Sequence, residues 1–202
     1  MSYMFYGLKS CTSLDLSSFN TSNVYLMDYM FKSSTSIITL NLTGFDISNA
    51  NSMKSMFFNC NSLKSLDLSS FIFNEVNINN FFLECNSLTS IKFSKEYKFI
   101  EEAASMFKNC YSLLSVDLYN FDFEIIEDLS YFFYGCNSLT SINLSFINTF
   151  STTNMKYMFY ECNSLIELNL KEWITSSVSD INSMFYDCNS LISLDLSNFD
   201  TS

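Results

Sequence analysis

One pattern of apolar and polar positions repeats along the whole chain. A phenylalanine marks each copy and recurs after 25 or 26 residues, at Phe5, Phe31, Phe57, Phe82, Phe107, Phe133, Phe159 and Phe185. Methionine or phenylalanine precedes this anchor phenylalanine, and an aliphatic residue lies nine positions after it in all eight copies. A fixed period of this length is typical of a solenoid, in which each coil covers the apolar faces of its neighbours.

Each copy divides into a predicted strand, a turn and a predicted short helix. Apolar and polar residues alternate around Leu66, which predicts a strand, and a polar turn with a large apolar residue, Phe71, follows. The spacing of Met27, Met30 and Phe31 predicts a helix with one buried stripe. We therefore expect an α/β solenoid of about eight 25–26-residue strand–turn–short-helix coils with one parallel sheet. Residues 1–202 form a single domain in this interpretation.

The fourth copy departs from the pattern. The sequence Lys92-Phe93-Ser94-Lys95-Glu96-Tyr97-Lys98 replaces the usual Asp-Leu-Ser-x-Phe. We therefore expect the turn of this copy to be rebuilt.

Composition excludes several classes of function. The formal charge is −11, with ten lysines, no arginine and no histidine. Nucleic-acid binding needs clustered cations, and histidine-based zinc sites and Ser-His-Asp catalysis need histidine. Polar residues interrupt every apolar run, so we expect no membrane insertion within this segment. We expect neither a cofactor nor a metal.

Six of the seven cysteines share one column, three residues after the anchor: Cys60, Cys85, Cys110, Cys136, Cys162 and Cys188. Stacked coils would place these thiols about 4.8 Å apart with parallel Cβ directions. A disulfide needs closer, converging Cβ atoms, and a thiolate metal site needs paired cysteines. We expect buried free thiols that fill small spaces; a disulfide or a metal site is the alternative.

Acidic residues recur at the outward middle position of the strands, at Asp15, Asp67, Asp117 and Asp195, and alternate with asparagine and Lys92. The column can be a solvated sheet face or a face that binds protein, glycan or calcium. An acid–base pair for hydrolysis is a third alternative. It needs two carboxyl groups in different environments, and a uniform ladder does not provide them.

Tyrosines gather in the last three copies, two residues before or one residue after the anchor: Tyr131, Tyr134, Tyr157, Tyr160 and Tyr186. With the anchor pointing inward, both positions are at least partly exposed. Tyrosine is enriched in recognition surfaces because it offers a large contact area at low entropic cost. We expect a candidate binding patch; the alternative is that the rings cover the core with their hydroxyl groups in water.

The copies at Met56–Phe71, Met158–Leu170 and Met184–Ser202 share Phe-x-x-Cys-Asn-Ser-Leu and Leu-x-Leu, and the last of them adds Ser-x-Phe-Asp. With the Asn-Val-x-x-Met segment that starts at Asn23, they resemble BspA-type leucine-rich repeats of the DUF285 class. The resemblance implies a leucine-rich-repeat array in a surface or secreted protein. It also implies a non-catalytic recognition or adhesion module, not an enzyme, that binds a protein or glycan partner.

The chain opens inside a predicted helix and stops before the next one. We therefore expect a segment of a longer array, or a chain that associates end to end with another copy. A self-stacking structural subunit of a filament or surface layer is the alternative function. A cytoplasmic location is the alternative to the cell surface, because no signal peptide is visible in this segment.

Overall fold

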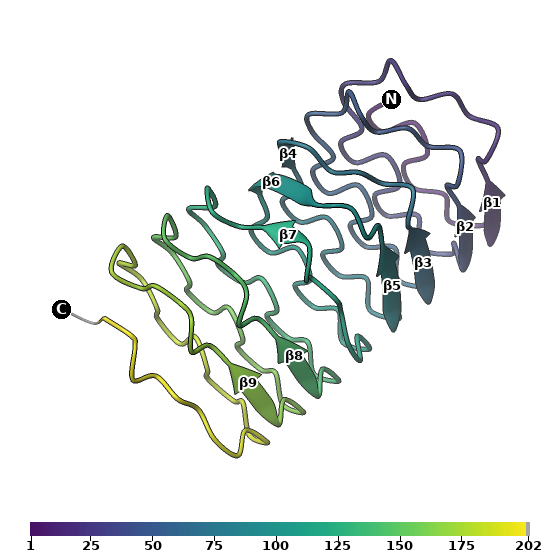
Figure 1. Cartoon of the computed structure of the whole chain (residues 1–202). Helices are drawn as coiled ribbons and strands as arrows, with labels where there is room; N and C mark the ends of the chain where they lie inside the picture. Colours follow the sequence, from purple (N-terminus) through teal and green to yellow (C-terminus); the bar gives the residue numbers. More distant parts are fainter. Residues whose placement is uncertain (201–202) are drawn as a thin grey trace.

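The computed structural model describes residues 1–200, and these residues form coils stacked along one axis (Figure 1). Short strands line one face of the stack: β1 (Ser13–Asp15), β2 (Thr39–Asn41), β3 (Ser65–Leu68), β5 (Ser90–Phe93), β8 (Ser141–Asn143) and β9 (Glu167–Asn169). They pair in parallel as β1–β2, β3–β5 and β8–β9. Equivalent positions of successive copies are in register, as Leu66 and Ile91 show.

A second set of strands lies on another side, in the middle of the stack (Figure 1). The strands β4 (Val76–Asn77), β6 (Lys98–Glu102) and β7 (Phe121–Asp122) form a three-stranded parallel sheet in the order β4-β6-β7. β6 begins in the irregular stretch of the fourth copy. The expected rebuilding of that turn is therefore confirmed.

The solenoid with parallel strands is confirmed, but three finer features of the prediction are wrong. Residues 1–200 contain no helix, and the strand side carries six strands, giving about six coils rather than eight. The pairing is also divided among separate small sheets instead of one continuous sheet. One break between these sheets falls after β5. The next copy makes a long hydrogen bond there, from Leu114 N–H to Thr89 O over 3.3 Å, and strand pairing between these copies is found instead between β6 and β7.

The segment predicted as a helix is a different structure, which we call the anchor turn: the five residues centred on the anchor phenylalanine. Alternate N–H groups bond within the turn to the carbonyl three residues back, as Lys32 does to Tyr29 O over 3.1 Å. The intervening N–H groups bond to the next copy, as Phe31 does to Met56 O over 2.9 Å. The three-residue bonds give nearly helical spacing, which explains why the apolar pattern predicted a helix.

Two residues of each anchor turn have a left-handed backbone, which an α-helix does not permit. They lie two residues before and two residues after the anchor, as Ser105 (φ 58°) and Asn109 (φ 60°) show. Gly7 and Gly135 occupy the second of these columns. Outside the two columns only Glu75 has a positive φ among residues 1–200.

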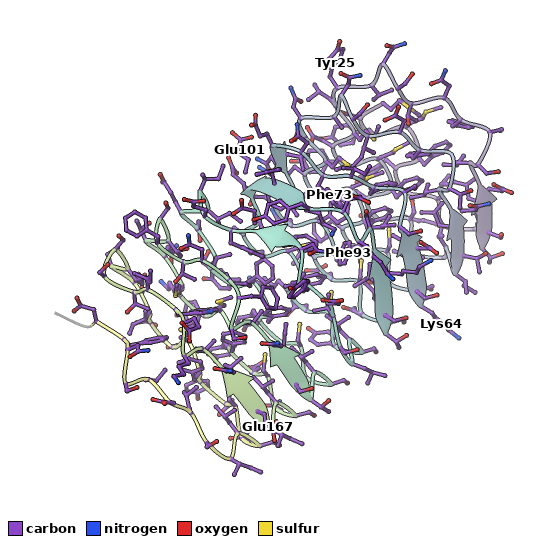
Figure 2. The ribbon with its side chains drawn as sticks, in the orientation of Figure 1. Tyr25, Lys64, Phe73, Phe93, Glu101 and Glu167 are labelled. Atoms are coloured by element: carbon purple, nitrogen blue, oxygen red, sulfur yellow. The ribbon has the colours of Figure 1, made fainter. Side chains whose placement is uncertain are left out.

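The anchor phenylalanines form one internal column, as predicted. Rings of successive copies lie 5.4–5.8 Å apart and within 14° of parallel. Phe31 and the next five anchors are fully buried, and each contributes about 2–3 kcal/mol by burial. Figure 2 shows Phe73 and Phe93 inside the coils as well, while Lys64 and Glu167 project outward.

The cysteine column lies against the anchor column. Each of the six thiols donates to the carbonyl of the preceding copy's anchor, as Cys110 does to Phe82 O over 3.1 Å. All seven cysteines are free, and burial raises the pKa of Cys60 to about 12. In the second copy Ser34 takes this position, and its hydroxyl donates to Phe5 O over 2.7 Å.

The left-handed backbone predicts an unusual stability order at Ser105. Ser105→Gly should be more stable than Ser105→Ala by about 0.5–1 kcal/mol, because only glycine adopts a positive φ without steric cost. Urea unfolding of both variants measures the difference. The reverse order, which is that of a helix interior, would contradict the anchor-turn backbone.

The thiol hydrogen bond predicts the order of stability of two variants at Cys110. Cys110→Ser should be more stable than Cys110→Ala, which should lose about 1 kcal/mol because its carbonyl partner loses one donor. Ser34 supplies the natural precedent for serine. Equal unfolding free energies for the two variants would show that the cysteine serves only to fill space.

Candidate functional site

The anchor turn places two rows of side chains on the outer surface. The residue two before the anchor and the residue one after it flank the buried phenylalanine, and both rows are exposed or half-buried where they carry tyrosine. Because the turns bond in register from copy to copy, equivalent side chains lie directly above one another. The five predicted tyrosines therefore come together on one face of the last three copies.

These five side chains form what we call the tyrosine ladder. In one row Tyr134 stacks on Tyr160 at 4.8 Å and 1°, and Tyr160 stacks on Tyr186 at 4.7 Å and 10°. In the other row Tyr131 stacks on Tyr157 at 5.1 Å. Tilted and edge contacts of 5.4–6.4 Å join the two rows.

Lysines lie over rings of both rows of the ladder. The Lys108 ammonium is 3.9 Å from the Tyr131 ring centre and 4.9 Å from that of Tyr134, and the Lys156 ammonium is 5.1 Å from that of Tyr157. Such cation–π contacts contribute about 0.5–1 kcal/mol at exposed sites. Neighbouring rings and lysines thus cover most of the ring faces, and the ring edges and hydroxyl groups are left to contact a partner.

The hydroxyl groups of Tyr134 and Tyr160 keep their protons at neutral pH. Partial burial raises the pKa of Tyr134, and the Glu161 carboxylate raises it further. The pKa of Tyr160 is raised by the same two causes together with its tyrosine neighbours. Within residues 1–200 none of the five hydroxyl groups makes a hydrogen bond to protein. The ladder therefore presents a row of free O–H groups at fixed spacing.

The predicted acidic column has a local structural task. One carboxylate oxygen of Asp15, Asp67, Asp117 and Asp195 accepts the backbone N–H two residues on, over 2.9 Å in each case. Asn41 and Asn143 accept in the same way. Each bond closes the turn that follows and uses one of the two carboxylate oxygens. The four aspartates do not converge on a common site.

Asp67 differs from the other three because it forms an ion pair. Its second oxygen is 2.8 Å from the Lys92 ammonium, which lies directly opposite in the β3–β5 register. The hydrogen bond from Lys92, together with those from Ser69, lowers the pKa of Asp67 to about 2. The pair neutralises one rung of the ladder, as the alternation of Asp with Asn and Lys predicts.

Sequence reasoning missed the residues around Lys98. This lysine is 1% exposed, and it lines a pocket beside β5 together with Ser94 and Tyr119. The unusual stretch from 92 to 98 was the available signal, but it indicated a rebuilt turn rather than a pocket.

No cluster in residues 1–200 has the three or more His, Cys, Asp or Glu side chains that would hold a metal ion. In the same part of the chain, no helix has the length and hydropathy needed to span a bilayer.

The ion pair predicts a pH-dependent contribution of Asp67. Its pKa is lower in the folded state than in the unfolded state, so the stabilisation is complete above about pH 4 and is lost toward pH 2. Asp67→Asn should cost less than about 1 kcal/mol at pH 7, because the pair is half exposed, and clearly less at pH 2, where about half of the folded carboxyl groups are protonated. Urea unfolding of the wild type and Asp67→Asn at both pH values measures this difference in free energy.

Asp15→Asn is the matched control, since Asp15 closes the same turn without a lysine partner. If Asp67→Asn lowers the free energy of unfolding at pH 7 no more than Asp15→Asn does, the ion pair with Lys92 is not stabilising.

Comparison with known proteins places this geometry in a family. The family described as "Mycoplasma protein of unknown function, DUF285" matches residues 1–95 and 101–202, and the interruption covers the end of the rebuilt turn and the start of β6. A leucine-rich repeat protein from Eubacterium ventriosum has a similar crystal structure, with a TM-score of 0.60 at 18% identity. The match covers 94% of this chain and 46% of that protein, so this chain spans about half its length. No curated protein matches. The chain thus belongs to the DUF285 family of BspA-type leucine-rich repeat proteins.

Proposed function

We propose that this chain is a non-catalytic recognition module of a surface or secreted protein, and that it binds a protein or glycan partner through the tyrosine ladder. The ladder carries the proposal because five tyrosines stack in register and keep their hydroxyl groups free. Membership of a leucine-rich repeat family supports a binding module. A surface location follows from the family resemblance alone.

The physics of the ladder favours recognition over a purely structural role. Stacking holds each ring in place, so little conformational entropy is left to lose when a partner binds. The stacked rings repeat every 4.7–5.1 Å, which suits a partner with regularly spaced acceptors, such as an extended peptide or a glycan chain. Lys108 and Lys156 add positive charge to a strongly acidic chain and favour partners with some negative charge.

The acidic column is less suited to this task. One oxygen of each carboxylate accepts the hydrogen bond that closes a turn. In the paired strands, the residue opposite an aspartate is Asn or Lys rather than a second aspartate. We therefore place binding on the tyrosine ladder rather than on Asp15, Asp67, Asp117 and Asp195.

The double change Tyr134→Ala and Tyr160→Ala should abolish partner binding while the fold remains. It removes two adjacent rungs, and aromatic pairs contribute only about 0.5–1.5 kcal/mol each to stability. Binding of labelled protein to a glycan array and to immobilised surface extracts measures the loss, and circular dichroism reports the fold.

Two further variants sharpen this test. Tyr25→Ala removes a tyrosine that is 61% exposed and lies outside the ladder, so it should bind as the wild type does. Tyr134→Phe with Tyr160→Phe keeps the stacked rings and removes the hydroxyl groups, so it should also lose binding. An unchanged binding profile in the double alanine variant would refute the proposal. Filaments that survive it would favour the self-stacking subunit.

A further inference from the structure

The rebuilt turn of the fourth copy contains a pocket of about 700 Å³ beside β5. Its walls come from three successive copies, because Ser70, Ile91 and Asn120 all line it. The volume lies within the range of about 300–1,000 Å³ that is typical of small-molecule sites. Three of the ten lysines, Lys92, Lys95 and Lys98, also line this pocket.

Lys98 is the unusual member of the lining. Its side chain is buried, and its ammonium donates to Glu96 O over 2.7 Å and lies 5.0 Å from the Phe121 ring centre. It has no carboxylate partner, because the ion pair found within residues 1–200 is that of Lys92 with Asp67. Lysine is almost never fully buried without a paired charge. With one N–H on Glu96 O and the Phe121 ring beside the ammonium, at least one N–H donor is left for another acceptor.

Ser94 is a second buried donor in the same lining. Its oxygen accepts the Glu96 N–H over 3.0 Å, and its own O–H finds no acceptor within residues 1–200. Both groups with spare hydrogen-bonding capacity are therefore donors, and one of them is charged. The complementary ligand group is an acceptor with a negative charge.

The acidic neighbours limit how much negative charge fits. Glu96 and Asp117 also line the pocket, and a doubly charged anion would be repelled by their carboxylates. Burial lowers the pKa of Lys98, while the Asp117 and Glu96 carboxylates partly restore it. A single carboxylate suits this balance better than a phosphate.

The remaining walls define the body of the ligand. Ile72, Ile91 and Phe93 contribute apolar surface, and Tyr119 adds a ring that is 67% exposed. We propose that this pocket binds a small monocarboxylate with an apolar body, whose carboxylate contacts Lys98 and Ser94. The site is separate from the tyrosine ladder and does not depend on the proposed function.

Benzoate and benzamide form a matched pair of probes, because they share size and ring and differ in charge. Titration of the full chain, followed by amide shifts in NMR spectra, should show saturable binding of benzoate with shifts concentrated at residues 91–98. Benzamide should not saturate at concentrations that fill a site of millimolar Kd. Inorganic phosphate should bind more weakly than benzoate.

Lys98→Met keeps the apolar stem and should weaken benzoate binding at least about tenfold, the effect of losing a charge-assisted hydrogen bond. Ser94→Ala should weaken it about threefold or more and tests the site independently if Lys98→Met fails to fold. Lys64→Met, at an exposed lysine outside the pocket, is the control and should change nothing.

Three results would overturn the proposal: no saturable benzoate binding to the wild type, equal binding of benzamide, or unchanged affinity in Ser94→Ala and Lys98→Met. The double alanine variant of the tyrosine ladder should bind benzoate as the wild type does, so failure at one site is distinguishable from failure at the other.

Discussion

The hydrogen bonds between successive anchor turns are the interaction on which the rest of this structure depends. On this face the N–H groups bond to the next copy in one direction only, as Phe31 does to Met56 and Phe57 does to Phe81. On the strand side the direction alternates, as in an ordinary parallel ladder: Leu16 donates to Asn41 of the next copy, and Ile38 donates back to Thr12. The peptide groups of the anchor turns therefore point the same way along the stack. Aligned groups polarise one another, which strengthens the column.

This constraint explains both the core and the surface. Cross-copy bonds fix the register, so the buried anchors stack at 5.4–5.8 Å and the outward tyrosines stack at 4.7–5.1 Å. The left-handed residues turn the backbone so that its alternate N–H groups reach the next copy. Their strain is of the order of 1 kcal/mol for each non-glycine residue, and hydrogen bonds on both sides of the turn offset it. A binding surface on this face inherits the rigidity of the column beneath it.

Sequence analysis correctly predicted the repeat, the internal phenylalanine column, the parallel strands and the family. These features could be predicted because the period and the apolar spacing depend directly on which side chains are buried. The predicted helix was wrong. Spacing at Met27, Met30 and Phe31 is shared by a helix and by successive three-residue turns, and only the backbone of Tyr29 and Ser33 distinguishes them. Glycine at Gly7 and Gly135 was a weak signal of that backbone. The pocket at Lys98 could not be predicted, since it depends on how one irregular turn packs against its neighbours.

Scalar coupling across hydrogen bonds in NMR spectra tests the anchor turn most directly. Our account predicts a coupling between the amide nitrogen of Phe107 and the carbonyl carbon of Phe132, whose oxygen accepts its N–H over 2.9 Å. An α-helix would instead couple Phe107 to Ala103, four residues back. Coupling to Ala103 would contradict the cross-copy ladder and the stacking derived from it.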